Sequence, residues 1–339
     1  MIPRLRIGVI GAGRIGKIHT ENIARFIPQA KLEGIADIRL SAEQKEWAGA
    51  LGARIVSKDP GDLLKDPSID AIVICSSTDT HADFVIAAAQ AGKHIFCEKP
   101  VDVSVPKVKA ALEAVKKAGV KLQVGFNRRF DHNFAQIRRH TLAGKIGNVH
   151  LVKISSRDPA PPPPSYVAVS GGIFLDMMIH DFDMARFQAG SEITEVYASG
   201  AVLVDPEIGR AGDVDTAIVT LKFANGAIGV IDNSRKAVYG YDQRVEVFGS
   251  AGAAMADNDV PNTVKLYNEA GVTGEKPLYF FLERYKGAFI DEMAAFVDAV
   301  QNNKPAPVTG EDGLADMYAA LAAGKSLKEK RPVKIEEAE

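Results

Sequence analysis

The first 125 residues alternate short apolar runs with segments of helical periodicity, and this alternation constrains the fold more than any other feature. Strands that alternate with helices form a parallel sheet with helices on both of its faces. The run Ala71-Ile72-Val73-Ile74-Cys75 is apolar throughout, as expected of a strand buried on both sides. We therefore predict an α/β domain with a doubly wound parallel sheet over residues 1–125. Its strands are expected at residues 4–10, 31–36, 54–56, 71–75, 94–97 and 121–124.

After residue 125 the pattern changes to strands in direct succession, preceded by helices at residues 132–143 and 174–188. The pair Asn225-Gly226 predicts a hairpin, because both residue types accept the positive φ angles of a type I′ turn. Strands joined by hairpins form antiparallel sheets, so residues 126–339 are predicted to be an α+β domain. The last helices, residues 288–301 and 313–327, are expected to pack back on the first domain.

Composition excludes several function classes. The chain has 41 basic and 43 acidic residues, so no basic excess is available to bind nucleic acid or an anionic membrane. Its apolar runs are far shorter than the roughly 20 residues of a transmembrane helix, and residues 1–7 lack the pattern of a signal peptide. Cys75 and Cys97 lie in strand-like runs without the spacing of metal ligands. We expect buried thiols in a reducing compartment, and hence a cytoplasmic protein.

A glycine-rich segment that matches G-x-G-x-x-G follows the first strand and opens the first helix. In that context the first glycine forms a tight turn, the second lets a pyrophosphate approach the backbone, and the third lets helix and strand pack closely. The N-terminus of the helix then offers N–H groups to the phosphates. The predicted dinucleotide-binding residues of this segment are Gly11, Ala12, Gly13, Arg14, Ile15 and Gly16.

Asp37 ends the second strand, 21 residues after Gly16. A carboxylate at this position accepts hydrogen bonds from the ribose hydroxyls and repels a 2′-phosphate, so we predict NAD as the cofactor. Arg39 leaves NADP open, because a nearby arginine can hold the 2′-phosphate.

Two further segments follow strands at the carboxyl edge of the predicted sheet, where such sheets bind ligands. Ser76, Thr78 and His81 are expected to line the dinucleotide, although Thr80 could also cap the following helix. Glu98 and Lys99 follow the strand at residues 94–97 and are expected beside the nicotinamide. There the ammonium of Lys99 can stabilise an alkoxide, whereas an isolated lysine after a strand is usually solvated.

Asp176, His180 and Asp183 are spaced at i, i+4 and i+7, on one face of a helix that is otherwise largely apolar. Burying such a polar set is costly unless it is paired or faces a cleft. Histidine suits general acid–base catalysis near neutral pH, and a carboxylate one turn away could orient it. A core histidine and a divalent metal site are the alternatives. No cysteine or second histidine completes a zinc set, so no metal is predicted.

These motifs, in this order, resemble the glucose–fructose oxidoreductase/inositol dehydrogenase/MocA family over essentially the whole chain, and within it the inositol 2-dehydrogenases. The resemblance implies an N-terminal Rossmann domain and a C-terminal domain whose large open antiparallel sheet serves oligomerisation, typically as a homotetramer. The matching segments are Gly11–Gly16, Glu98-Lys99-Pro100, 125–131, Asp176-x-x-x-His180-x-x-Asp183, Tyr239-Gly240-Tyr241-Asp242 and 308–313.

The resemblance also implies a catalytic set, Lys99, Asp176 and His180. Two features depart from the family pattern: Phe130 stands where a tyrosine is common, and the proline-rich run of residues 159–164 is unusual. Both would alter the rim of the substrate site. The residues implied to surround a polyol substrate are Asn127, Arg129, Arg157, Asp158, Asp183 and Tyr241.

The expected reaction is NAD-dependent oxidation of an inositol ring hydroxyl to a ketone, with His180 as the general base and Lys99 and Asp176 assisting. A dehydrogenase of a hexose or anhydro-sugar is the alternative within the family. A non-catalytic, dinucleotide-gated binding protein is a more distant alternative, and such a protein would be expected to lack Lys99 or His180. The inositol isomer and the physiological direction are left open by the sequence.

Overall fold

The computed structural model describes residues 3–338, and the chain divides into two compact units. The first unit comprises the residues up to Asn127 together with Ala288–Ala315, and the second comprises Arg128–Gly287 together with the residues from Asp316 onward. This division lies close to the predicted boundary after residue 125. It places the helix expected at residues 288–301 in the first unit, whereas most of the helix expected at residues 313–327 belongs to the second. None of the described helices is long and apolar enough to cross a membrane.

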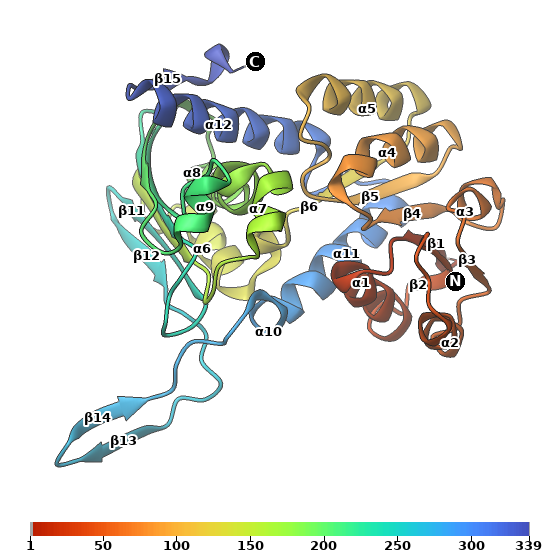
Figure 1. The fold of residues 1–339 in the computed structure, drawn as a ribbon, viewed down its shortest axis with the longest axis horizontal. Helices are drawn as coiled ribbons and strands as arrows, with labels where there is room; N and C mark the ends of the chain where they lie inside the picture. Colours follow the sequence, from red (N-terminus) through yellow and green to blue (C-terminus); the bar gives the residue numbers. More distant parts are fainter. Residues whose placement is uncertain (1–2, 339) are drawn as a thin grey trace. The chain divides into compact units, whose positions relative to one another are not determined.

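The first unit is built on a six-stranded parallel sheet with the order β3-β2-β1-β4-β5-β6 (Figure 1). Its central strands are apolar because helices cover both faces, and all four residues of β4 are buried. The predicted doubly wound α/β fold is therefore confirmed. The strands are β1 Leu5–Ile10, β2 Ala30–Ala36, β3 Ile55–Ser57, β4 Ala71–Ile74, β5 His94–Glu98 and β6 Leu122–Gly125.

A continuous apolar core joins β1 and β2 to helices α1 and α11 on one face of this sheet. Met293, Phe296 and Val297 of α11 belong to that core, which explains why this C-terminal helix is part of the first unit. The helices of the unit are α1 Arg14–Arg25, α2 Ala42–Ala50, α3 Gly61–Lys65, η1 Thr78–Thr80, α4 His81–Gln90, α5 Val105–Ala118 and α11 Lys286–Gln301, and α12 Gly310–Glu329 begins here.

The strand order reverses between β1 and β4, which places a topological switch point at their carboxyl ends. Ligands of open α/β sheets bind at such a point. The glycine-rich loop leaves β1 there, and Ser76 follows β4 at the same edge.

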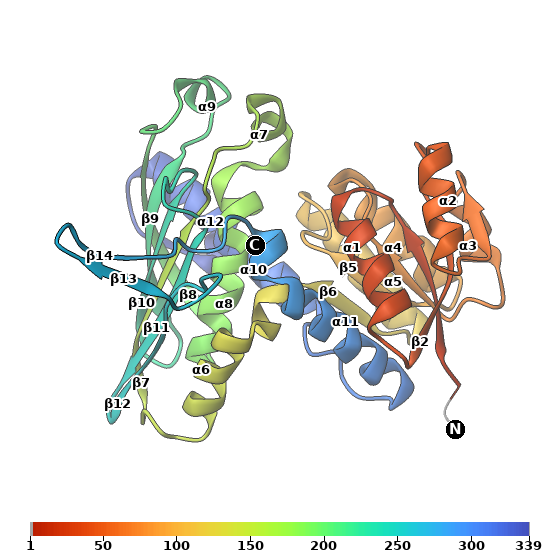
Figure 2. The same ribbon diagram turned by 90° about the horizontal axis from the view of Figure 1, so that it is seen from below.

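The second unit contains a seven-stranded sheet with the order β12-β11-β7-β10-β9-β8-β15. Figure 2 shows α6 and α8 along one face of this sheet. The prediction of an antiparallel sheet is correct except that β7 and β10 pair in parallel. The strands are β7 Val149–Arg157, β8 Ile193–Ala201, β9 Thr216–Phe223, β10 Ile228–Ser234, β11 Asp242–Gly249, β12 Gly252–Ala256 and β15 Val333–Lys334, with a separate hairpin of β13 Lys265–Asn268 and β14 Gly271–Gly274.

The predicted helix over residues 174–188 is interrupted. Its first part, η3 Ile173–Met178, is a π-helix, and α8 Ile179–Ala189 continues it. Gly171 and Gly172, both with positive φ, precede the π-helical turn. Such turns occur frequently at functional sites, and this one carries Asp176. The other helices of the unit are η2 Asn127–Phe130, α6 His132–Leu142, α7 Pro164–Ser170, α9 Pro206–Arg210, α10 Phe281–Arg284 and η4 Ile335–Glu337.

The hairpin between β9 and β10 forms where Asn225-Gly226 predicts it, but the turn type is different. Gly226 has a φ of +87°, whereas Asn225 has no positive φ, so the turn is not type I′. The side chain of Asn225 instead accepts a hydrogen bond from the backbone N–H of Ala227, which stabilises the loop locally.

Candidate active site

The glycine-rich loop has the geometry of a phosphate cradle. Gly11 has a φ of +102°, and a Cβ there would lie 2.5 Å from the carbonyl oxygen of Cys75. A Cβ on Gly16 would lie 2.0 Å from the carbonyl oxygen of Gly11, so helix α1 packs closely on the loop. Gly13 is exposed and has no neighbour within 4 Å of its Cβ position. The space above Gly13 therefore fits a pyrophosphate at the N-terminus of α1.

Asp37 is bound to this loop. Its Oδ2 accepts a hydrogen bond of 2.7 Å from the backbone N–H of Ala12, and its Oδ1 accepts one from that of Arg39. Gln44 donates to the carbonyl oxygen of Ala12 at 3.0 Å, a contact that the sequence analysis missed. The carboxylate is thus fixed beside the loop at the end of β2, the position from which it can contact an adenosine ribose.

His81 lies between the loops that follow β4 and β5. It is buried, and its ring nitrogens contact the carbonyl oxygens of Pro100, at 2.9 Å, and of Ser76, at 3.0 Å. It connects the loops after β4 and β5, so we interpret it as a residue that holds these two loops together at the carboxyl edge of the parallel sheet. The side chain of Thr80 forms no cap on α4, and donates instead to the carbonyl oxygen of Ser77. Thr78 is partly exposed in the 3-10 turn η1.

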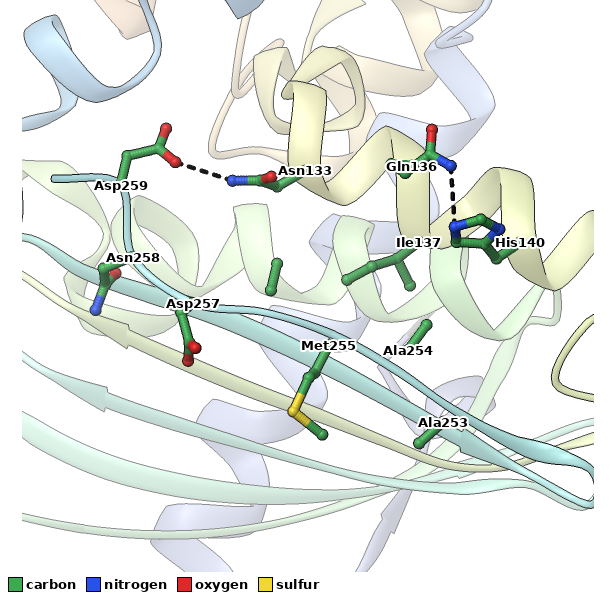
Figure 3. A pocket seen from close by; sticks show the side chains of 11 residues that line it. Asn133, Gln136, Ile137, His140, Ala253, Ala254, Met255, Asp257, Asn258 and Asp259 are labelled. Atoms are coloured by element: carbon green, nitrogen blue, oxygen red, sulfur yellow. Dashed lines mark hydrogen bonds between the residues drawn. The ribbon is translucent and has the colours of Figure 1, made fainter. Parts of the chain in front are cut away.

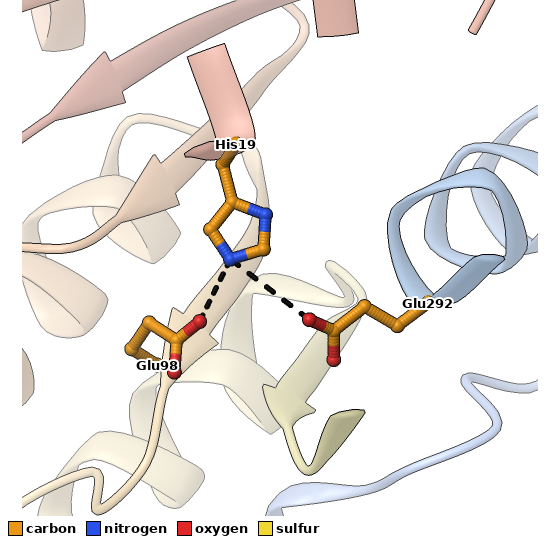
Figure 4. A group of neighbouring side chains, drawn as sticks. All are labelled: His19, Glu98 and Glu292. Carbon is orange, nitrogen blue, oxygen red and sulfur yellow. Dashed lines mark hydrogen bonds and ion pairs between the residues drawn. The ribbon is translucent and has the colours of Figure 1, made fainter. Parts of the chain in front are cut away.

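Glu98 takes part in a buried group that the sequence analysis did not identify (Figure 4). His19 Nε2 lies 2.7 Å from Glu98 Oε1 and 3.9 Å from Glu292 Oε1. Burial and the charge of Glu98 raise the pKa of Glu292 well above its ordinary value, which favours a neutral Glu292. The group links α1, β5 and α11. Its only sequence signal is a histidine three residues after Gly16, and Glu292 is too distant in the chain to be paired with it by inspection.

Lys99 directly follows β5 and is partly exposed. The peptide bond between Lys99 and Pro100 is cis, which the sequence leaves open. Lys99 therefore lies at the carboxyl edge of the first unit, next to Glu98.

Asp176 and His180 lie on consecutive helical segments of the second unit, and both are partly exposed. The two carboxylate oxygens of Asp176 have different partners. Oδ1 accepts a hydrogen bond of 2.9 Å from the hydroxyl of Tyr166, and Oδ2 lies 3.4 Å from Arg235 Nη1. Neither partner was predicted from the sequence.

Asp158 belongs to the same charged region. Burial raises its pKa from 3.8 to about 6, against the opposing effects of Arg235 and Arg128, while the charges of Asp176 and Asp181 raise it further. A carboxyl group with a pKa in this range can change protonation state near neutral pH, a property that often marks functional sites.

The predicted residue Asp183 is fully buried, and its carboxylate accepts three hydrogen bonds from the guanidinium of Arg129. Asp183 therefore lies among core residues, whereas Asp176 is partly exposed, because the π-helical turn disrupts the expected single face. Next to this pair, Arg128 Nη1 contacts Asp181 at 2.5 Å in full burial. Arg128 was not predicted, although it adjoins Arg129.

Arg157 lies on the opposite face of the sheet from the predicted site. Side chains alternate along β7, and Ser156 faces the helices, where it contacts Arg128. Arg157 consequently points to the open face and pairs with Asp232 at 2.6 Å. We therefore remove Arg157 from the proposed substrate site.

Tyr241 is buried against the rings of Phe280 and Tyr285. The charge of Arg128 lowers its pKa and the charge of Asp158 raises it, although burial dominates and the net pKa is well above 10. Tyr241 thus borders the charged region around Asp158. Asn127, at the start of η2, is buried and belongs to the first unit.

Two groups among the described residues contain ligand types suited to a cation. In the first, the group of His19, Glu98 and Glu292, burial raises the pKa of Glu292, and this favours the neutral form and so reduces the negative charge. In the second, Asp131 and Asp259 both pair with the guanidinium of Arg284, which supplies the positive charge. Neither arrangement requires a metal ion.

A cavity of about 600 Å³ lies between α6 and the segment 253–259 (Figure 3). Its walls are mostly polar and include Asn133, Gln136 and His140. None of the predicted catalytic or substrate residues lines it, so we do not assign it to the reaction.

Comparison with known proteins agrees with these features. A dinucleotide cradle with a carboxylate at the end of β2 occurs in one chain with a sheet domain that carries Asp176 and His180 on consecutive helical segments, as expected of an NAD-binding oxidoreductase. Residues 5–126 match the family described as "Oxidoreductase family, NAD-binding Rossmann fold", and residues 134–255 match the "GFO/IDH/MocA C-terminal domain". The chain belongs to this Gfo/Idh/MocA family.

The chain is 54% identical to the myo-inositol 2-dehydrogenase of Thermotoga maritima over 333 residues, covering 98% of this chain and 99% of that protein. It is 46% identical to the inositol 2-dehydrogenase of Rhizobium meliloti, covering 98% and 99% of the two chains. The crystal structure of scyllo-inositol dehydrogenase from Lactobacillus casei, with bound NAD(H) and scyllo-inositol, superposes with a TM-score of 0.90 at 33% identity, covering 98% and 99%.

Two glycine substitutions separate packing from cofactor binding. In Gly16→Ala the new Cβ would lie against the carbonyl oxygen of Gly11, so we expect a lower melting temperature and weaker NAD binding. In Gly13→Ala the Cβ has space in the free protein, so the melting temperature should stay unchanged. NAD should nevertheless bind at least about tenfold more weakly, because the methyl group occupies the approach of the pyrophosphate.

Calorimetric titration with NAD and thermal melts of the free proteins measure both effects. Wild-type NAD affinity in Gly13→Ala would contradict the assignment of the cradle.

The raised pKa of Asp158 predicts a pH-dependent stability. The folded chain binds this proton more tightly than the unfolded chain, so the stabilisation is present below pH 3.8 and lost as pH rises through about 6. Asp158→Asn cannot titrate. Its free energy of unfolding relative to wild type should therefore rise by up to about 3 kcal/mol between acidic and neutral pH, since one pKa unit corresponds to about 1.4 kcal/mol. Urea unfolding of both proteins tests this, and a difference that does not change with pH would contradict it.

Proposed function

We propose that this chain is an NAD-dependent inositol dehydrogenase that oxidises a ring hydroxyl to a ketone. The observation that carries the proposal is the 54% identity to a myo-inositol 2-dehydrogenase over 98% of the chain. The intact cradle around Gly13 and the presence of Lys99, Asp176 and His180 support it further. A binding protein without activity would have no need of these three side chains.

In the proposed mechanism, the reacting hydroxyl of the inositol hydrogen-bonds to Lys99 and His180. His180, oriented by Asp176, removes the hydroxyl proton, and the ammonium of Lys99 stabilises the developing alkoxide. The glycine-rich cradle and Asp37 would hold NAD, which would supply the acceptor for the hydride that leaves the same carbon, and the product is the ketone. Lys99 belongs to the first unit and His180 to the second.

The remaining hydroxyls of the inositol require polar partners, because specificity for a polyol depends on pairing its hydroxyls with buried polar groups. Asp158 and Tyr241, which border one charged region in the second unit, are suited to this role. Asn127, Arg129 and Asp183 remain predicted contacts. Of the Arg129–Asp183 pair, the guanidinium of Arg129 would contact the substrate, because the carboxylate of Asp183 already accepts hydrogen bonds from Arg129.

We also propose that the enzyme is a homo-oligomer, a tetramer in keeping with the family resemblance, that associates through the open face of the large sheet. Five large apolar side chains, Tyr197, Ile218, Ile228, Phe248 and Met255, are exposed on strands of this sheet. Exposed apolar side chains on one sheet are candidates for an interface, because a large exposed apolar surface often marks one. Light scattering of wild type and of Phe248→Asp tests this association, and a wild-type monomer would contradict it.

The two buried free cysteines, Cys75 and Cys97, support a reducing compartment such as the cytoplasm.

The function is tested by the absorbance of NADH during turnover of myo-, scyllo- and chiro-inositol, D- and L-glucose and a sugar phosphate, each with NAD and with NADP. We expect turnover of inositols with NAD, and little with NADP because Asp37 repels a 2′-phosphate. Turnover restricted to a hexose would contradict the inositol assignment. The absence of any turnover, with NAD bound, would favour a binding protein.

Replacement of His180 by Ala should lower kcat by at least about a hundredfold, since the general base is lost. The matched control is His140→Ala, because His140 is also partly exposed and its ring contacts Gln136, which is not in the proposed catalytic set. We expect the control to retain wild-type kcat. Steady-state rates at saturating NAD measure both variants, and wild-type turnover by His180→Ala would remove His180 from the mechanism.

A further inference from the structure

The carboxylate of Asp176 is held from two sides by residues outside the catalytic set. The hydroxyl of Tyr166 donates a hydrogen bond of 2.9 Å to Oδ1, and Arg235 Nη1 lies 3.4 Å from Oδ2. Each oxygen thus has its own donor, and the plane of the carboxylate is defined by two groups that come from different elements of the fold.

Arg235 is the buried one of the two donors to the carboxylate of Asp176. It follows β10, and only 1% of its side chain is exposed. Its Nη2 also lies 3.6 Å from Asp213 Oδ2, so the guanidinium is placed between two carboxylates. Burial of a cation is costly unless it is paired. The pairing with Asp176 and Asp213 therefore fixes Arg235, and Arg235 in turn restrains Asp176.

Tyr166 is the exposed one of the two donors to the carboxylate of Asp176. It belongs to the short helix α7, which follows the proline-rich run of residues 159–164 and ends at Gly171 and Gly172. Almost half of Tyr166 is exposed, so its hydroxyl reaches Asp176 from the surface. The run that departs from the family pattern therefore leads directly to a residue that contacts the proposed catalytic carboxylate.

We propose that Tyr166 and Arg235 are positioning residues of the reaction, which together hold the carboxylate of Asp176 in the orientation that aligns His180. The assay of this role depends on the proposed function, because the rate is read with an inositol. Two donors restrain the rotation of the carboxylate relative to the histidine four residues later, and loss of either donor removes one of these restraints.

The charges of the region give Arg235 a second, measurable effect. Asp158 is faced by Arg128, Arg235, Asp176, Asp181 and Tyr241. Burial raises the pKa of Asp158 to about 6, and Arg235 opposes this rise. Removal of the positive charge of Arg235 therefore raises the pKa of Asp158 further. Asp158 would then be neutral up to a higher pH, and a neutral carboxyl group accepts hydrogen bonds from the polyol more weakly than a carboxylate does.

Tyr166→Phe is the decisive variant, because the exposed position tolerates the loss of a hydroxyl. We expect kcat for the best inositol to fall about tenfold, the equivalent of one charge-assisted hydrogen bond, with KM within about twofold of wild type. Tyr267→Phe is the matched control, since Tyr267 is also exposed and lies on β13 of the separate hairpin. Wild-type kcat in Tyr166→Phe would overturn the role of Tyr166.

Arg235→Lys and Arg235→Gln separate charge from orientation. Lys keeps the positive charge but lacks the planar guanidinium with its two terminal nitrogens. We therefore expect kcat to fall while the pH dependence of KM remains that of wild type. Gln loses both, so KM should rise at neutral pH and recover at alkaline pH as Asp158 ionises. Arg284→Lys, at an equally buried arginine paired with Asp131, should change stability alone. Unchanged kinetics in both Arg235 variants would overturn the role of Arg235.

Crystal structures of Tyr166→Phe and wild type without substrate test the proposal independently of any activity. We expect the carboxylate of Asp176 to adopt more than one orientation in the variant and a single one in wild type. If wild type turns over no inositol, the proposed function fails, and these structures still decide the positioning role. An Asp176 carboxylate that stays in place in Tyr166→Phe would overturn it.

Discussion

The pairing of buried carboxylates with arginines along α8 is the interaction on which the second unit depends. Asp181 and Asp183 are fully buried, and Arg186 is nearly so. Arg128 and Arg129 neutralise the two carboxylates, and Arg186 pairs with a buried aspartate of α12. An unpaired buried charge would be strongly destabilising, so α8 can pack against the sheet in only one rotation. That rotation leaves Asp176 and His180 as the polar groups of the helical segment that are partly exposed.

The same principle operates at each level of the candidate site. Arg235 lies between the carboxylates of Asp176 and Asp213 and restrains that of Asp176. The positive charges of Arg128 and Arg235 also oppose the rise in the pKa of Asp158. Among the described residues of the first unit, no arginine neutralises the buried carboxyl group of Glu292. Burial instead favours its protonated, uncharged form beside His19 and Glu98. The chemistry of NAD-dependent oxidation thus takes place beside groups whose ionisation is determined by burial and by a few specific partners.

Sequence reasoning identified the features that depend on local pattern. The strand–helix alternation predicted the parallel sheet, and the glycine spacing predicted a loop whose Gly11, Gly13 and Gly16 have the expected geometry. It failed where distant residues meet. The role of His81 between two carbonyl groups, and the position of Arg157 on the open face, depend on how loops and strands assemble. The π-helical turn before α8 has no periodic signature, so a single helical face was wrongly expected to hold Asp183 beside Asp176.

The proposed reaction transfers the hydrogen of the reacting alcohol carbon of an inositol directly to NAD. Myo-inositol that carries deuterium on every ring carbon tests this transfer, with the mass of the reduced cofactor measured after turnover. We expect one deuterium in each molecule of NADH and a product that has lost one deuterium. Reduced cofactor without deuterium, or a product that keeps all of its deuterium, would contradict direct transfer.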